Sequence, residues 1–155
     1  MIQRQPLPAT RCLGVRGAIT AGSNTVDGIL AATRELLTEI VAANGIVKED
    51  IGGVFITTTM DLNAEFPAVA ARQLGWEDTA ILCGHEMAVP DGPSRTIRVM
   101  VMWNTSLAAR DIQHVYLGEA QRLRPDRPNG RLPADVSAAN VPIPHTASTS
   151  EEKLS

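Results

Sequence analysis

Aromatic residues, cysteines and long apolar runs are all scarce in this chain. Phenylalanine, tyrosine and tryptophan make up 3% of the residues, too few for the stacking platforms that bind single-stranded nucleic acid. The two cysteines, Cys12 and Cys83, exclude a disulfide-rich scaffold and favour a reducing compartment. No run of about 18 apolar residues predicts a membrane span, and the first residues lack the apolar stretch of a signal peptide. We therefore expect a cytoplasmic protein with no nucleic-acid or membrane partner.

Net charge is small as well. A value of −3 at pH 7 gives no general field that would attract nucleic acid or an anionic membrane, so any recognition of an anion must be local. The length of 155 residues fits one domain with a substantial core. We expect a lead over residues 1–10, one domain over 11–126, and a disordered tail over 127–155 that is rich in Pro, Ala and Ser.

One long amphipathic helix is the clearest local element. Ser23-Asn24-Thr25 offers N-cap residues, apolar residues then recur at helical spacing, and Asn44-Gly45 provides a C-terminal stop. Pro67 predicts the first turn of a short second helix. Apolar and β-branched runs predict strands over residues 12–20, 54–59, 79–83, 96–102 and, as a short strand or helical turn, 113–117. The expected fold class is α/β or α+β, a mixed β-sheet packed on one long helix.

Arg98 stands in the middle of the apolar run 96–102, which is typical of a strand buried on both faces. Arginine keeps its charge and is almost never fully buried without a partner. Two partners are open. One is an internal carboxylate in a structural ion pair, the commoner case for a lone arginine in a strand, and the other is a bound anionic ligand. Arg98 alone carries no functional conclusion.

Three more polar residues, Arg16, Cys83 and Glu86, stand in strands or at strand ends. We expect them to converge with Arg98 on one pocket, with Arg72 of the short helix within reach. Three arginines favour a ligand with more than one carboxylate or phosphate. Two roles are open for Glu86: it neutralises Arg98, or it accepts a hydrogen bond from a ligand hydroxyl.

Thiol and metal chemistry are weaker interpretations of Cys83. A cysteine that ends an apolar strand is more often a small buried hydrophobic residue than a reactive thiolate. A metal site of Cys83 and His85 with Cys12 or His114 lacks the paired spacing of zinc motifs. The glycines fit neither a phosphate-binding loop nor a dinucleotide-binding turn. We therefore expect no metal and no cofactor.

Six short blocks follow one another in a specific order between Cys12 and Asp126. They are Arg16-Gly17-Ala18, Asp61-Leu62 with Phe66-Pro67-Ala68, Cys83-x-x-Glu86-Met87, Ile97-Arg98-Val99-Met100, His114-Val115-Tyr116-Leu117 and Leu123-Arg124-Pro125-Asp126. In order and spacing they resemble the monofunctional chorismate mutases of the AroH type. Their joint occurrence is far more specific than any single block.

This resemblance implies a homotrimer with a pseudo-α/β barrel and active sites in clefts between neighbouring subunits. It implies an isomerase that converts chorismate to prephenate without a cofactor, in the biosynthesis of phenylalanine and tyrosine. The reaction is an intramolecular Claisen rearrangement, in which one C–O bond breaks as a C–C bond forms. Because it requires no nucleophile, catalysis must come from selection of the compact conformer and from electrostatics.

The resemblance also implies roles for individual residues. Arg98 is expected beside the ether oxygen, and Glu86 and the Cys83 thiol are expected at the ring hydroxyl. Arg16 and Tyr116 are expected to bind a carboxylate. Four further side chains are expected at the wall and mouth of the pocket: Phe66, Arg72, Leu123 and Arg124.

Two positions depart from the family pattern. Val69 stands where some members carry a lysine near the cleft, and Gly84-His85 replaces larger residues that are not histidine. Another class of function stays open beside the mutase: a Rid-type imine deaminase, or a non-catalytic trimeric protein that binds small anions. The discriminating feature is Glu86 three residues after Cys83, because a simple carboxylate binder needs no such carboxylate.

Overall fold

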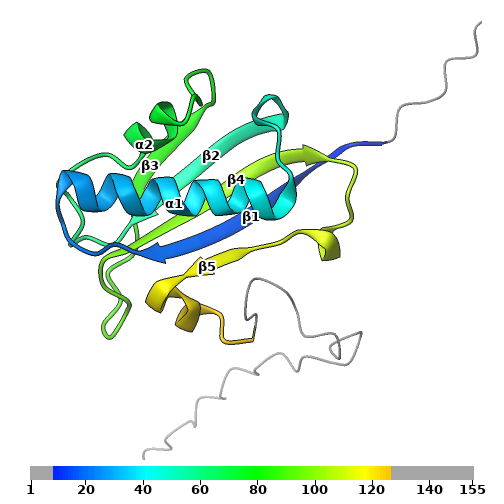
Figure 1. The fold of residues 1–155 in the computed structure, drawn as a ribbon. Helices are drawn as coiled ribbons and strands as arrows, with labels where there is room; N and C mark the ends of the chain where they lie inside the picture. The colour runs from blue at the N-terminus through cyan, green and yellow to red at the C-terminus, as the bar shows by residue number, and fades with distance from the viewer. Residues whose placement is uncertain (1–8, 127–155) are drawn as a thin grey trace, which may run out of the picture.

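The computed structural model describes residues 9–126, which form a single five-stranded sheet with two α-helices (Figure 1). The expected lead, apart from its last two residues, and the expected tail lie outside the described residues. The elements in chain order are β1 (Arg11–Thr20), α1 (Val26–Asn44), β2 (Ile51–Thr58), α2 (Ala68–Gln73), β3 (Ile81–His85), β4 (Thr96–Thr105) and β5 (Val115–Leu117). Three short 3-10 helices complete the set: η1 (Lys48–Asp50), η2 (Ala109–Asp111) and η3 (Gly118–Leu123).

The helix α1 begins and ends where its capping residues predict. The Thr25 hydroxyl accepts the backbone N–H of Gly28 at 3.0 Å, which satisfies one of the free donors of the first turn. Gly45 adopts the left-handed conformation, at φ 67°, and donates its N–H to the carbonyl of Val41. The long amphipathic helix expected from the sequence is confirmed.

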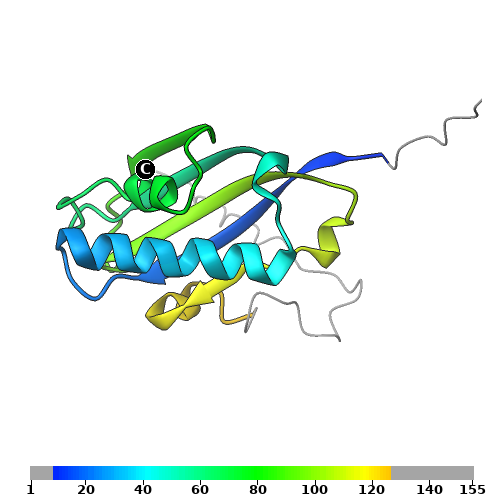
Figure 2. The same cartoon turned by 45° about the horizontal axis from the view of Figure 1, so that its top comes forward.

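The sheet is mixed, with the strand order β3-β2-β4-β1-β5. β4 pairs antiparallel with both β1 and β2, while the outer strands β3 and β5 run parallel to β2 and β1. α1 lies across one face of this sheet, and α2 lies near the β3 edge (Figure 2). The mixed sheet on one long helix agrees with the expected fold class.

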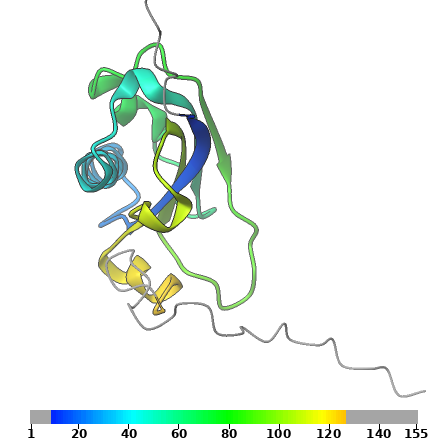
Figure 3. The same ribbon diagram turned by 90° about the vertical axis from the view of Figure 1, so that its right-hand side faces the viewer.

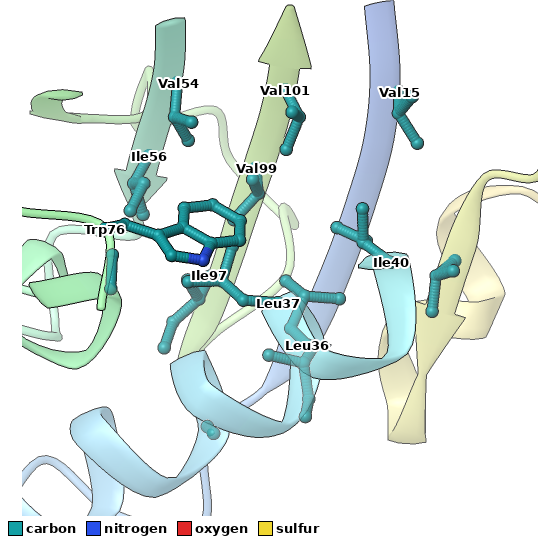
Figure 4. Packing of buried hydrophobic residues seen from close by; sticks show 14 of the residues in the cluster. Val15, Leu36, Leu37, Ile40, Val54, Ile56, Trp76, Ile97, Val99 and Val101 are labelled. Carbon is teal, nitrogen blue, oxygen red and sulfur yellow. The ribbon is translucent and has the colours of Figure 1, made fainter. Parts of the chain in front are cut away.

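The core occupies the space between α1 and the sheet. Leu36, Leu37 and Ile40 of the helix are fully buried against the strands (Figure 4). Viewed along the sheet, α1 stands on one side, and no α-helix of the described residues packs against the other side (Figure 3). We call this second side the open face; among the described residues, η3 covers it at its β5 end, where it packs over Ala18.

The strand that contains Arg98 is not buried on both faces, so the sequence-based expectation for it is wrong. Along β4 the odd-numbered residues are buried, whereas Arg98 and Met100 are exposed on the open face. The error arises because Met100 and Met102 make the run continuously apolar although α1 covers only one side of the strand.

Gly17 of β1 lies where side chains of α1 pack tightly on the sheet. A Cβ atom at this position would lie 2.6 Å from Cδ1 of Ile40, 3.0 Å from Cδ1 of Leu36 and 3.1 Å from the carbonyl oxygen of Val115. Glycine is required here by space and not by its backbone angles. None of the helices in the described residues is long and apolar enough to cross a membrane.

Candidate active site

The open face carries a row of polar side chains at the centre of the sheet. The register pairs Arg98 of β4 with Ala18 of β1 on one side and with Thr57 of β2 on the other. Tyr116 of β5 pairs with Ala18 of β1, and Arg16 lies two residues before Ala18 on the same strand. The strand alternation thus brings residues from four strands to one surface.

These side chains line a cavity of about 290 Å³, which we call the cationic pocket. Its polar lining comes from Arg16, Thr57, Glu86, Arg98 and Tyr116. Arg16, Glu86, Arg98 and Tyr116 were all expected at the site from the sequence, and one chain brings these four together. A second hollow, of about 390 Å³, shares Glu86 and Arg98 and continues toward the loop between β3 and β4.

Arg98 and Glu86 form an ion pair, with Nε 3.5 Å from Oε1. The same carboxylate oxygen accepts the Thr57 hydroxyl at 2.6 Å. Glu86 is therefore held from two sides and orients the guanidinium. The two terminal nitrogens of Arg98 donate no hydrogen bond within the described part of the chain, so they are available to an anion.

The solvent exposure of the two side chains limits the contribution of this ion pair to the free energy of unfolding. The side chains of Arg98 and Glu86 are 48% and 27% exposed, so water screens their attraction. Pairs of this kind contribute between zero and about 1 kcal/mol. The structural ion pair considered for Arg98 exists, but it is not a buried charge pair on which the core depends.

A separate pocket lies beside α2, on the side of the sheet that α1 occupies. This thiol pocket, of about 420 Å³, is lined by Phe66 and Pro67 before α2, by Cys83 and His85 of β3, and by Thr58 of β2. Phe66 is 70% exposed, which is high for a phenylalanine and places its ring at an uncovered surface. Val69, at the position of the absent lysine, is a half-buried residue of α2.

Burial raises the pKa of the Cys83 thiol, and this effect outweighs the Ala68 backbone N–H and the positive charge of Arg72, which both lower it. The thiol is therefore protonated at neutral pH and is a hydrogen-bond donor, not a thiolate nucleophile. Arg72 is an exposed residue of α2 whose charge reaches this pocket. Within the described residues no group of three or more His, Cys, Asp or Glu residues is arranged to hold a metal ion.

Cys83 does not share a pocket with Arg98 in one chain, so the expected convergence of Arg16, Cys83, Glu86 and Arg98 is wrong at the level of the subunit. Cys83 pairs with Ile56, whose side chain faces α1, whereas Arg98 pairs with Thr57, on the open face. Side chains alternate along a strand with a period of two. Glu86 stands three positions after Cys83, and this odd spacing places them on different sides of the sheet edge.

Leu123 is the last residue of η3, at the β5 side of the open face, and Arg124 follows it. Leu123 packs against the small cluster of Ala18, Tyr116 and Ala120 and lines a surface hollow of about 410 Å³. Arg124 makes two hydrogen bonds to Asp126, at 2.8 and 3.0 Å, and this carboxylate raises the pKa of the guanidinium. Tyr116, which lines the cationic pocket, also raises the pKa of Arg124, so Arg124 lies within electrostatic reach of that residue.

Two contributors to the cationic pocket were missed by the sequence reasoning. Thr57, which binds Glu86, is one of three consecutive threonines, and only its pairing with Arg98 distinguishes it. His114 is buried and accepts the backbone N–H of Arg16 at Nδ1, at 3.0 Å. In the sequence, His114 stands in the block that contains Tyr116, but no role was assigned to it.

Comparisons with known proteins identify relatives of this chain. The family model of chorismate mutase type I matches residues 12–127. The chain is 47% identical over 114 residues to the chorismate mutase AroH of Thermus thermophilus, a match that covers 73% of this chain and 93% of that protein. It is 40% identical over 114 residues to the chorismate mutase AroH of Bacillus subtilis (strain 168), covering 73% of this chain and 90% of that protein.

The fold agrees with a solved structure as well. A chorismate mutase from Clostridium thermocellum, Cth-682, superposes with a TM-score of 0.70 at 44% sequence identity. This match covers 71% of this chain and 98% of that chain, so it includes nearly all of the solved protein. With a family model matched over most of its length and relatives above 30% identity, the chain belongs to the chorismate mutase type I family.

Proposed function

We propose that this protein is a chorismate mutase, an isomerase that converts chorismate to prephenate in the biosynthesis of phenylalanine and tyrosine. The observation that carries the proposal is the Arg98 guanidinium, held by Glu86 in a pocket that Arg16 and Tyr116 also line. Chorismate is a dianion, and this pocket offers two cations and a phenol to it. Membership of the chorismate mutase type I family supports the binding of this substrate by these groups.

The proposed mechanism is conformer selection followed by electrostatic stabilisation. Arg16 and Tyr116 hold a carboxylate, so that the enolpyruvyl side chain lies over the ring in its compact form. As the C–O bond breaks, negative charge develops on the ether oxygen, where the terminal nitrogens of Arg98 stabilise it. Glu86 faces the positive charge that develops on the ring. A preorganised donor of this kind typically contributes about 2.7–4 kcal/mol to the barrier.

The division between two pockets supports a site shared between subunits. In this proposal one subunit supplies the cationic pocket with Arg16, Glu86, Arg98 and Tyr116, and Leu123 and Arg124 at its rim. Its neighbour supplies the thiol pocket with Phe66, Arg72 and Cys83. The substrate then meets both sets of residues, although no single chain brings them together.

A homotrimer with a pseudo-α/β barrel is the assembly that we propose. The open face presents apolar side chains to solvent: Phe55 is 44%, Leu82 65% and Met100 38% exposed. Apolar groups gathered on one face of a sheet favour burial against another surface. Neighbouring copies of the chain provide that surface, so the cationic pocket becomes enclosed on assembly.

The alternative classes lack comparable support. Neither an imine deaminase nor a non-catalytic anion binder is named among the relatives, and the carboxylate of Glu86 beside Arg98 suits a reaction that develops both charges. We propose that the enzyme acts without a metal or cofactor, because the rearrangement needs none. We also propose a cytoplasmic location, in keeping with the free thiols of Cys12 and Cys83.

The direct test is to follow the loss of chorismate and the formation of prephenate with the purified full-length protein. We expect turnover without added metal or cofactor, and absence of turnover would refute the enzymatic proposal. The assembly is tested by light scattering, with an expected mass three times the 16.6 kDa of the chain. Leu82→Glu places a charge on the open face and should abolish the trimer and the activity together. A monomeric variant that keeps full activity would refute the shared site.

A further inference from the structure

His85 is the residue of the thiol pocket to which neither the resemblance nor the relatives assign a role. It follows Cys83 by two residues on β3, so both side chains stand on the same side of this strand. Both line the pocket of about 420 Å³, together with the exposed ring of Phe66. The imidazole is thus built into the same cavity as the thiol.

Thr58 fixes the orientation of this ring and the tautomer of its neutral form. The Thr58 side chain is buried, and its hydroxyl donates to the carbonyl of Leu62 at 3.3 Å. Its oxygen therefore accepts from Nδ1 of His85, at 3.0 Å. The carbonyl oxygen of Thr58, which can only accept, lies 3.4 Å from the same nitrogen. Both oxygens require the proton of the neutral ring on Nδ1.

The other ring nitrogen is then an acceptor. With the proton on Nδ1, Nε2 carries a lone pair, and within the described residues it makes no hydrogen bond. The thiol of Cys83 is protonated and is a donor, as its raised pKa indicates. The pocket therefore pairs one donor and one acceptor on a single strand, an arrangement that matches a hydroxyl group, which both donates and accepts.

We propose that His85 is a specificity-determining residue that accepts, at Nε2, the hydrogen bond of the ring hydroxyl of chorismate while Cys83 donates to the hydroxyl oxygen. This inference rests on the proposed function and names the group that the thiol pocket recognises. Thr58 acts through His85 as a positioning residue. Because the hydroxyl takes no part in the bond rearrangement, His85 affects substrate binding more than the chemical step.

The test compares chorismate with its analogue in which hydrogen replaces the ring hydroxyl. In His85→Leu, we expect KM for chorismate to rise about three- to tenfold, the value of one ordinary hydrogen bond, with kcat nearly unchanged. The affinity for the analogue, measured by competition, should stay as in the wild type. His85→Gln, which retains an acceptor, should recover most of the affinity for chorismate.

Thr58→Val is the second variant, because it removes only the group that orients the ring. It should raise KM for chorismate less than His85→Leu and leave the analogue unaffected. An unchanged KM in His85→Leu, or an equal loss of affinity for chorismate and the analogue, would overturn the inference. Neither result affects the proposed mutase activity, since the wild-type enzyme would still convert chorismate.

Discussion

The two faces of the sheet differ in what their side chains touch. On the face toward α1, Val15, Ile56 and Val101 are completely buried and belong to the main hydrophobic cluster. On the open face, the next residues along the same strands include Arg16 and Thr57, and they line a cavity. The same strands thus hold the core together with one set of alternate residues and present chemistry with the other. Changes on the two faces should therefore have separable effects on stability and on catalysis.

Leu37→Ala tests the face toward α1 and carries the largest expected effect. Leu37 is fully buried in α1, so the truncation removes apolar contacts and leaves a cavity. We expect a loss of about 2–5 kcal/mol in the free energy of unfolding, measured with urea, and unchanged activity per folded molecule. Glu39→Ala, at an exposed position of the same helix, should change stability by no more than about 0.5 kcal/mol. Equal effects of the two changes would contradict the assignment of the core.

Arg98→Ala tests the open face and should show the opposite pattern. Loss of the guanidinium should lower kcat/KM by about two to three orders of magnitude. Stability should change by less than about 1 kcal/mol, because the ion pair with Glu86 is half exposed. Arg110→Ala is the matched control, since Arg110 is an exposed arginine whose partner, Asp111, is likewise acidic. A severe loss of stability in Arg98→Ala would restore the structural interpretation of this residue.

Asp61 connects the loops at one end of the sheet and predicts a smaller, pH-dependent effect. The Thr59 hydroxyl and the backbone N–H of Arg95 donate to its carboxylate, and these hydrogen bonds lower its pKa. Since the folded pKa lies below the unfolded one, its contribution to stability is present at neutral pH and is lost as the pH falls through the folded value. Urea unfolding of Asp61→Asn should show a deficit at neutral pH that disappears in acid. Asp78→Asn, at an exposed carboxylate, is the matched control for the loss of one negative charge.

The two cysteines offer the smallest and simplest contrast. Cys12 is exposed, whereas burial raises the pKa of Cys83 and keeps it as the thiol. Iodoacetamide should therefore label Cys12 severalfold faster than Cys83 at neutral pH, as measured by peptide mass spectrometry. Cys83→Ser should retain activity within about tenfold, since a hydroxyl replaces the hydrogen bond. A covalent adduct at Cys83 during turnover would contradict the rearrangement mechanism.

The sequence predicted the local secondary structure better than it predicted which side chains lie on which face of the sheet. The bounds of α1 followed from Thr25 and Gly45, because capping depends on neighbouring residues only. The exposure of Arg98 could not be predicted from the sequence. An apolar run indicates a strand, but it does not show whether one face or both faces of that strand are covered. Side chains alternate between the two faces of a strand, so this rule predicts the separation of Cys83 from Arg98 once the strand pairing is known. The pairing of Cys83 with Ile56 comes only from the structure. Thr57 and His114 were missed because their contacts lie across strands, at positions that no local pattern marks.

Gly17 shows how a packing constraint can limit the variation of an enzyme. Its neighbours along β1 are Arg16, which lines the cationic pocket, and Ala18, which packs under Tyr116. A single added methyl group would press on Ile40 of α1 and on the carbonyl of Val115 in β5. Relief of that pressure would move β1 or β5, and either shift displaces a side chain that we assign to substrate binding. A substitution at Gly17 is thus opposed for two reasons, the steric clash in the core and the displacement of a substrate-binding side chain. Extra stability elsewhere in the protein would compensate for the first effect but not for the second.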